Sequence, residues 1–151
     1  MPRVSHERVE CPVARTVDVI GDRWSLLIVR DVFDGIHRFG ELQRNLGLAK
    51  NILTSRLREL VAQGILQIVP AADGTSYHEY ELTEKGRDLF HIIVALRQWG
   101  EAHLFEEGEP HSALLDTAHS LPLRKLQATD NDGQPIASAG TFVRKLSPGS
   151  R

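Results

Sequence analysis

Apolar residues recur every three or four positions over residues 12–46, which is the spacing of α-helices that bury one face. A first helix is expected over residues 12–20. A second is expected over RWSLLIVRDVF, where Asp22 is a suitable N-cap and Gly35 follows the helix end. RFGELQRNL predicts a third, short helix that ends at Gly47. The first part of the chain is therefore expected to fold as three helices.

The stretch AKNILTSRLRELVAQGILQIV, residues 49–69, changes its period at Gly64. Before the glycine, leucines recur at the spacing of one helix face, because each residue turns an α-helix by about 100°. After it, ILQIVPA and HEYEL alternate as half-buried strands do, and the Asp73–Gly74 pair between them is typical of a hairpin turn. The pattern predicts a helix followed at once by a β-hairpin.

A long helix is expected after the hairpin, over about residues 84–105, with Thr83 as its N-cap. Its apolar stripe is long for one small domain, so the stripe is also a candidate surface for a partner chain. Beyond Glu109 the sequence is rich in turns; residues 121–146 form a candidate second hairpin, and the final SPGSR is expected to fray. We expect an α+β, mainly helical fold in three parts: an N-terminal arm (1–10), one domain (11–108) and a C-terminal extension (109–151).

Helix, short turn, helix, hairpin and long helix is the order of elements in a winged helix-turn-helix. In that fold a helix enters the major groove of DNA, where exposed polar side chains reach base edges, and the hairpin, or wing, lies alongside. The helix before Gly64 carries Thr, Ser and Asn opposite its leucines, although these residues are poor helix formers. The candidate DNA-binding residues are Arg38, Arg44, Lys50, Asn51, Thr54, Ser55, Arg56, Arg58, Thr75, Tyr77 and His78.

The distribution of charge supports this interpretation better than the net charge of -2 does. Residues 38–69 contain five basic and two acidic side chains. Residues 99–119 contain five acidic side chains and no lysine or arginine. The near-neutral net charge therefore combines a basic middle segment with an acidic later segment. Solvated helix faces also carry such runs of charge.

Composition excludes several other classes of protein. With 41% hydrophobic residues the chain can build a core. No apolar run approaches the roughly 18 residues of a membrane span, and the first residues lack the apolar stretch of a signal peptide. We therefore expect a cytoplasmic protein with no membrane partner. The single cysteine rules out an intramolecular disulfide and a cysteine-rich zinc site.

No enzyme motif is present: there is no G-x-S-x-G, no glycine-rich phosphate loop and no H-E-x-x-H. We expect neither catalysis nor a cofactor. The densest set of candidate metal ligands, histidines and glutamates over residues 103–119, is too widely spaced for a compact site and is better explained as a solvated acidic helix end. The sequence also allows a small-molecule effector, whose identity it does not give.

Several segments together resemble the HxlR family of bacterial transcriptional regulators: CPV, RW, RFGEL, LTSRLREL and YELT. The resemblance covers about residues 11–100 and does not extend to the tail after residue 110. It implies a homodimeric winged-helix protein whose N-terminal and long C-terminal helices form the dimer. Such dimers bind pseudo-palindromic operators in double-stranded DNA, and the expected action is steric repression. The alternative is a winged helix that binds proteins and not DNA.

Cys11 lies where members of that family commonly have a cysteine, and in some of them this thiol senses oxidants or electrophiles. A sensing thiol must be exposed and readily ionised. Cys11 precedes Pro12 at a helix start, with Arg8 and Arg15 near in sequence and Glu10 opposing them. Because no second cysteine exists, a response needs a bridge between two chains, a mixed disulfide or an adduct. The alternative is a small residue buried between two subunits, and the sequence leaves both open.

Overall fold

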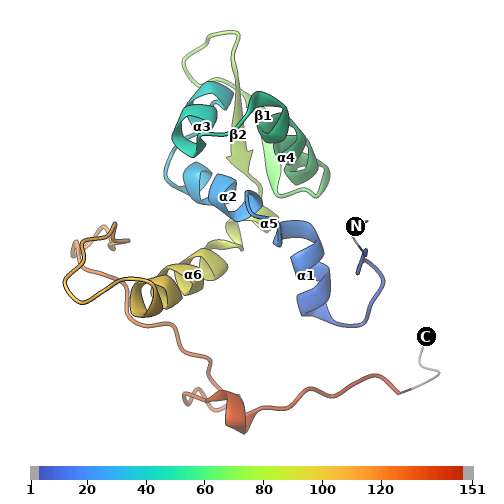
Figure 1. The fold of residues 1–151 in the computed structure, drawn as a ribbon, viewed down its shortest axis with the longest axis vertical. Helices are drawn as coiled ribbons and strands as arrows, with labels where there is room; N and C mark the ends of the chain where they lie inside the picture. Colours follow the sequence, from blue (N-terminus) through green and yellow to red (C-terminus); the bar gives the residue numbers. More distant parts are fainter. Residues whose placement is uncertain (1–3, 148–151) are drawn as a thin grey trace. The chain divides into compact units, whose positions relative to one another are not determined.

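A computed structural model of the chain describes residues 4–147 and contains two units, Met1–Ile93 and Val94–Arg151. α6 (Phe90–His103) begins in the first unit and continues into the second, which also holds the short 3-10 helix η1 (Ser138–Gly140). The other elements belong to the first unit (Figure 1). They are α1 (Pro12–Ile20), α2 (Ser25–Phe33), α3 (Phe39–Leu46), α4 (Lys50–Ala62), β1 (Leu66–Pro70), β2 (His78–Leu82) and α5 (Glu84–Arg87).

Local side-chain bonds explain where two of these helices begin. The N-cap residue of α2 is Trp24 and not the predicted Asp22. The Asp22 carboxylate nevertheless caps the start of the helix from two residues earlier, because it accepts hydrogen bonds from the backbone N–H groups of Trp24 and Ser25, each at 3.0 Å. The Thr83 hydroxyl accepts from the Gly86 N–H at 3.1 Å and begins α5, which confirms the predicted cap. Both caps satisfy N–H groups that lack a partner in the first turn of a helix.

The core of the first unit lies between α2, α3, α4 and the base of the hairpin. Its buried side chains are mostly leucine, isoleucine and valine, and α4 contributes leucines from one face only. Asp31 of α2 is also fully buried, and its carboxylate accepts from the Asn45 amide at 2.7 Å and pairs with Arg30 at 2.8 Å. A buried carboxylate with such partners avoids the cost of an unsatisfied charge and joins α2 to α3.

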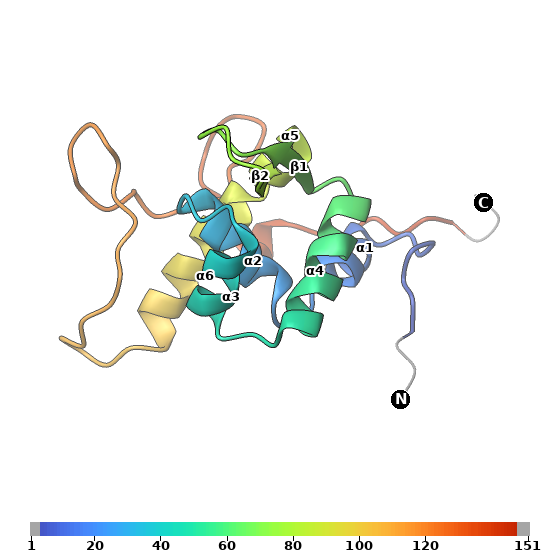
Figure 2. The ribbon, with the colours of Figure 1, turned by 90° about the horizontal axis from the view of Figure 1, so that it is seen from above.

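β1 and β2 form an antiparallel pair in which Leu66 lies opposite Leu82 and Pro70 opposite His78. The two leucines are buried at the base, whereas the loop of residues 71–77 projects beyond α3 and α4 (Figure 1). Gly74 has a φ of 77°, the left-handed conformation that favours glycine in such a turn. In Figure 2 the strands lie along one side of the group formed by α2, α3 and α4. The predicted winged helix-turn-helix is therefore present.

The single long helix expected over residues 84–105 is divided into α5 and α6. The break falls at Asp88 and Leu89, where the Leu89 N–H donates to the Gly86 carbonyl at 3.0 Å, three residues back instead of four. Leu89 packs against the core, and Gly86 is buried with no room for a side chain between it and the Ile65 carbonyl. Close packing of α5 on the base of the hairpin therefore interrupts the helix.

The two strands of the second hairpin expected over residues 121–146 are absent from that segment of the structure. Among residues 109–147 the structure has only isolated antiparallel bridges, Leu115 to Pro122 and Thr129 to Pro135, and η1. Each bridge contains a proline, which has no N–H to extend a ladder. The predicted fraying of SPGSR lies, apart from Ser147, outside the described residues. No helix within residues 4–147 has the length and apolar character to cross a membrane.

Candidate nucleic-acid interface

The polar face of α4 forms one exposed surface. Leu53, Leu57 and Leu60 bury the opposite face completely, with exposed fractions of 1% or less. Along the exposed side runs an open groove of about 850 Å³. Its lining consists of Lys50, Asn51, Thr54, Ser55, Arg58, Glu59 and Ala62. The structure thus brings together the five residues that the helix period assigned to this face, and adds an acidic one, Glu59.

The groups on this surface are available for a ligand. Neither Lys50 nor Arg58 forms an ion pair within the described part of the chain. The side chains of Asn51 and Ser55 are exposed, whereas the Thr54 hydroxyl donates to the Lys50 carbonyl at 2.8 Å. An amide that can donate and accept at once suits a base edge, and mobile cations suit phosphates.

Arg56 lies apart from this groove, although it was predicted with the other DNA-binding residues. Its Nη1 is 3.8 Å from Oδ1 of Asp22, whose carboxylate accepts from the N–H groups at the start of α2. This follows from its position nearer the apolar face of α4, where its stem packs and its head meets the neighbouring helix. Arg56 therefore supports the attachment of α4 to the start of α2.

A second groove, of about 630 Å³, lies where the start of α3 meets the wing. Arg44 is exposed on α3 and has no ion pair among the described residues. Tyr77, 64% exposed, and His78 come from the wing. The lining residues are Arg38, Phe39, Gly40, Glu41, Arg44, Ser76, Tyr77, His78 and Tyr80. Residues of α3 and of the wing, which are distant in sequence, therefore meet in this groove.

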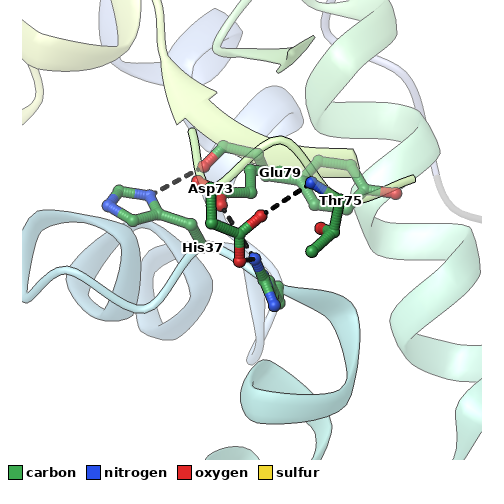
Figure 3. Close-up of polar contacts among 6 residues, drawn as sticks. His37, Asp73, Thr75 and Glu79 are labelled. Carbon is green, nitrogen blue, oxygen red and sulfur yellow. Dashed lines mark hydrogen bonds and ion pairs between the residues drawn. The ribbon is translucent and has the colours of Figure 1, made fainter. Parts of the chain in front are cut away.

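Arg38 is held by the wing. Its Nη2 lies 2.5 Å from Oδ2 of Asp73 and 3.5 Å from Oε1 of Glu79, and its guanidinium lies 5.2 Å from the centre of the Tyr77 ring. The loop brings Asp73 back towards Thr75, whose N–H donates to the carboxylate at 3.0 Å (Figure 3). Hydrogen bonds from the side chain and backbone of Thr75, and then from Arg38, lower the pKa of Asp73 to about 2. Asp73 is thus a permanent anion at physiological pH, in contact with a predicted phosphate-binding arginine.

His37 ties the base of the wing to the segment before α3. The Tyr80 N–H donates to the His37 carbonyl at 2.8 Å, and His37 Nδ1 donates to the Tyr80 carbonyl at 2.9 Å (Figure 3). The sequence pattern did not indicate His37 or Glu79 as parts of the site, and it did not indicate Asp73 as a partner of Arg38. Asp73 was recognised only as a turn residue, and no local pattern pairs it with an arginine 35 positions earlier.

Cys11 is the N-cap residue of α1 and is partly buried. The Arg15 side chain, which is near Cys11 in sequence, donates through Nε to the Val9 carbonyl at 2.6 Å. Elsewhere within residues 4–147 no three His, Cys, Asp or Glu side chains gather in a way that could hold a metal ion.

Comparisons with known proteins agree with this geometry. The model of the HxlR-like helix-turn-helix family matches residues 19–108. The uncharacterised HTH-type transcriptional regulator Rv3095 of Mycobacterium tuberculosis is 48% identical over 108 residues, which are 71% of this chain and 68% of that protein.

Two solved structures are also similar. PA1607, described as a candidate transcription factor, is 51% identical with a TM-score of 0.89, and the match covers 95% of this chain and 100% of PA1607. Such coverage extends well past residue 108 into the extension. The redox regulator HypR in its reduced form is 37% identical with a TM-score of 0.57 over 62% of this chain and 94% of HypR.

Proposed function

This chain belongs to the HxlR-like helix-turn-helix family of transcriptional regulators, and we propose that it acts as a homodimer that binds a pseudo-palindromic DNA operator and represses transcription. The observation that carries the proposal is the exposed groove of α4, which gathers all five polar residues expected there. A helix with one face in the core and unpaired polar groups on the other has the shape that the major groove admits.

The proposed mechanism follows from paired docking. The two α4 helices of a dimer enter successive major grooves about 34 Å apart. Lys50 and Arg44 contact phosphates, and Asn51, Ser55 and Arg58 face base edges. The wing, with Thr75, Tyr77 and His78, lies against the flanking backbone. A promoter covered in this way excludes the polymerase.

Support for a homodimer comes from apolar side chains that the single chain leaves in water. Val13 of α1 is 70% exposed, and on α6 Leu96 and Trp99 are 49% and 59% exposed. Exposed apolar groups at helical spacing mark surfaces for association. We propose that both helices contribute to the interface between two copies.

The experiment that tests the proposal measures binding of the full-length protein to the intergenic DNA beside its own gene across a potassium chloride series. A double variant, K50A with R58A, is expected to bind roughly tenfold or more weakly and to reduce the salt slope by about one for each phosphate contact removed. The control, R124A with K125A, removes the same charge from the extension and is expected to bind normally.

Two results would contradict the proposal. Equal losses in the variant and the control would place the interface away from α4. Absence of DNA binding in all conditions, together with capture of a protein that salt barely displaces, would support the alternative of a protein-binding winged helix.

A response to oxidants is a second proposal, centred on Cys11. It is supported by the partly exposed position of this thiol at the start of α1 and by the likeness to HypR, a redox regulator. Diamide is expected to release the protein from DNA through a Cys11–Cys11 bridge or a mixed disulfide, and C11S is expected to ignore diamide. If diamide does not change DNA binding by the unmodified protein, Cys11 is only a packing residue.

A further inference from the structure

Much of the exposed apolar surface belongs to the extension after residue 109. Phe142 is 89% exposed and Val143 is 78% exposed, and Leu121 is 60% exposed. Over residues 127–147 every side chain is exposed except Ile136, which is partly buried. A segment of this kind has no core of its own, so its apolar side chains gain nothing from the fold of a single chain.

The extension nevertheless has a definite local structure. Its first half is tied to α6, because the Gln98 amide donates to the Arg124 carbonyl at 3.0 Å and accepts from the Leu126 N–H at 2.8 Å. In its second half the Asp130 carboxylate accepts from the N–H groups of Asp132 and Gln134, each at 2.9 Å. Turns stabilised in this way preorganise the backbone, which lowers the entropy lost on binding.

Charge indicates which surface the end of the extension meets. Arg144 and Lys145 directly follow the apolar pair, and neither forms an ion pair among the described residues. Residues 101–116 carry five acidic side chains and no basic one. Every copy of the chain contains both segments, so two copies offer two complementary pairs.

We propose that residues 127–147 form an arm that packs against a second copy of the chain, with Phe142 and Val143 as its apolar contacts and Arg144 and Lys145 facing the acidic segment 101–116 of that copy. This inference rests on the homodimer of the proposed function. It adds an interface outside the residues that the family model matches, which end at residue 108.

The first test is sedimentation of the full-length protein over a concentration series. The variant F142D with V143D is expected to raise the dissociation constant of the dimer roughly tenfold or more, because two apolar contacts are lost and negative charge is placed near an acidic surface. The matched control, Q67D with S76D, adds the same charge to exposed polar positions of the hairpin, outside the arm, and is expected to leave the constant unchanged. Equal dissociation constants for the two variants would overturn the proposal.

The second test places the photo-reactive amino acid p-benzoylphenylalanine at position 142 of the full-length chain. Cross-linked species of twice the chain mass, attached at or near residues 101–116, support the arm. Cross-links found only within one chain of a protein that still sediments as a dimer overturn the arm and leave the homodimer intact. Sedimentation as a monomer at all concentrations overturns both, and cross-linking only to added DNA assigns the arm to nucleic acid and overturns its packing on a second copy.

Discussion

Arg38, a predicted phosphate contact, is held by two acidic side chains of the wing. Its guanidinium is engaged by Asp73, a carboxylate whose pKa is lowered to about 2, and by Glu79. A phosphate that contacts Arg38 must therefore replace a protein anion that stays charged at any physiological pH.

Asp73→Asn is expected to tighten DNA binding about two- to tenfold, since it releases Arg38 and removes a negative charge that faces the phosphates. Fluorescence anisotropy with labelled operator measures the change. Glu81→Gln is the matched control, because it removes one exposed charge from β2 without touching Arg38. Weaker binding by the Asp73 variant than by the control would mean that Asp73 is needed to shape the wing.

Asp22 makes the stability of the α2 start depend on pH. Burial raises its pKa, but hydrogen bonds from the Ser25 hydroxyl and from the backbone of Trp24 and Ser25, with Arg56 nearby, outweigh burial and leave the pKa below 3.8. The unfolded chain therefore binds this proton more readily than the folded chain. The contribution is present above pH about 4 and is lost as the pH falls below 3.8.

Urea unfolding at pH 7 and pH 3 measures this effect. Asp22→Ala is expected to lower the free energy of unfolding by about 1 kcal/mol at pH 7 and by less at pH 3. Asp22→Asn keeps an oxygen acceptor but cannot titrate, so the difference in the free energy of unfolding between this variant and the unmodified protein should change with pH. The same difference at pH 7 and pH 3 would contradict a lowered pKa of Asp22.

At the scale of elements, α5 depends on the absence of a side chain at Gly86. A Cβ there would lie 2.2 Å from the Ile65 carbonyl oxygen, so α5 could not keep its contact with the base of the hairpin. Gly86→Ala is expected to lower the free energy of unfolding by about 1–3 kcal/mol. Gly40→Ala in α3 is the control, because its Cβ would meet only the end of Arg44 at 3.4 Å, and it should be neutral or slightly stabilising. Equal effects would mean that α5 can move away from the strand at little cost.

At the scale of the whole molecule, the proposed homodimer requires that the two half-sites of its operator lie on the same side of the DNA. Inserting about 5 base pairs between the half-sites rotates one by half a turn and is expected to weaken binding at least about tenfold. An insertion of about 10 base pairs restores the phase and should weaken binding less. Changing the spacer sequence at constant length is the control in the same anisotropy assay. Binding that tolerates both insertions equally would indicate that each copy binds alone.

Local interactions within the sequence were enough to predict the four helices before Gly64, the wing and the polar face of α4. The period of the leucines placed Lys50, Asn51, Thr54, Ser55 and Arg58 on one side, and the structure gathers them in one groove. A capping residue such as Thr83 bonds to a backbone group only three residues away, so it can be predicted from the sequence alone. The family resemblance rested on the same segments.

Only the tertiary structure decided which charges meet and where a long helix breaks. Arg38 pairs with Asp73, which lies 35 positions later in the sequence, because the fold brings the two segments together. For the same reason Arg56 of α4 pairs with Asp22, which precedes α2. The break before α6 depends on Gly86 packing against Ile65, a contact that no helical period contains. The spacing of apolar residues and the capping residues depend on interactions between near neighbours in the sequence. The pairings described above depend instead on how the whole unit packs.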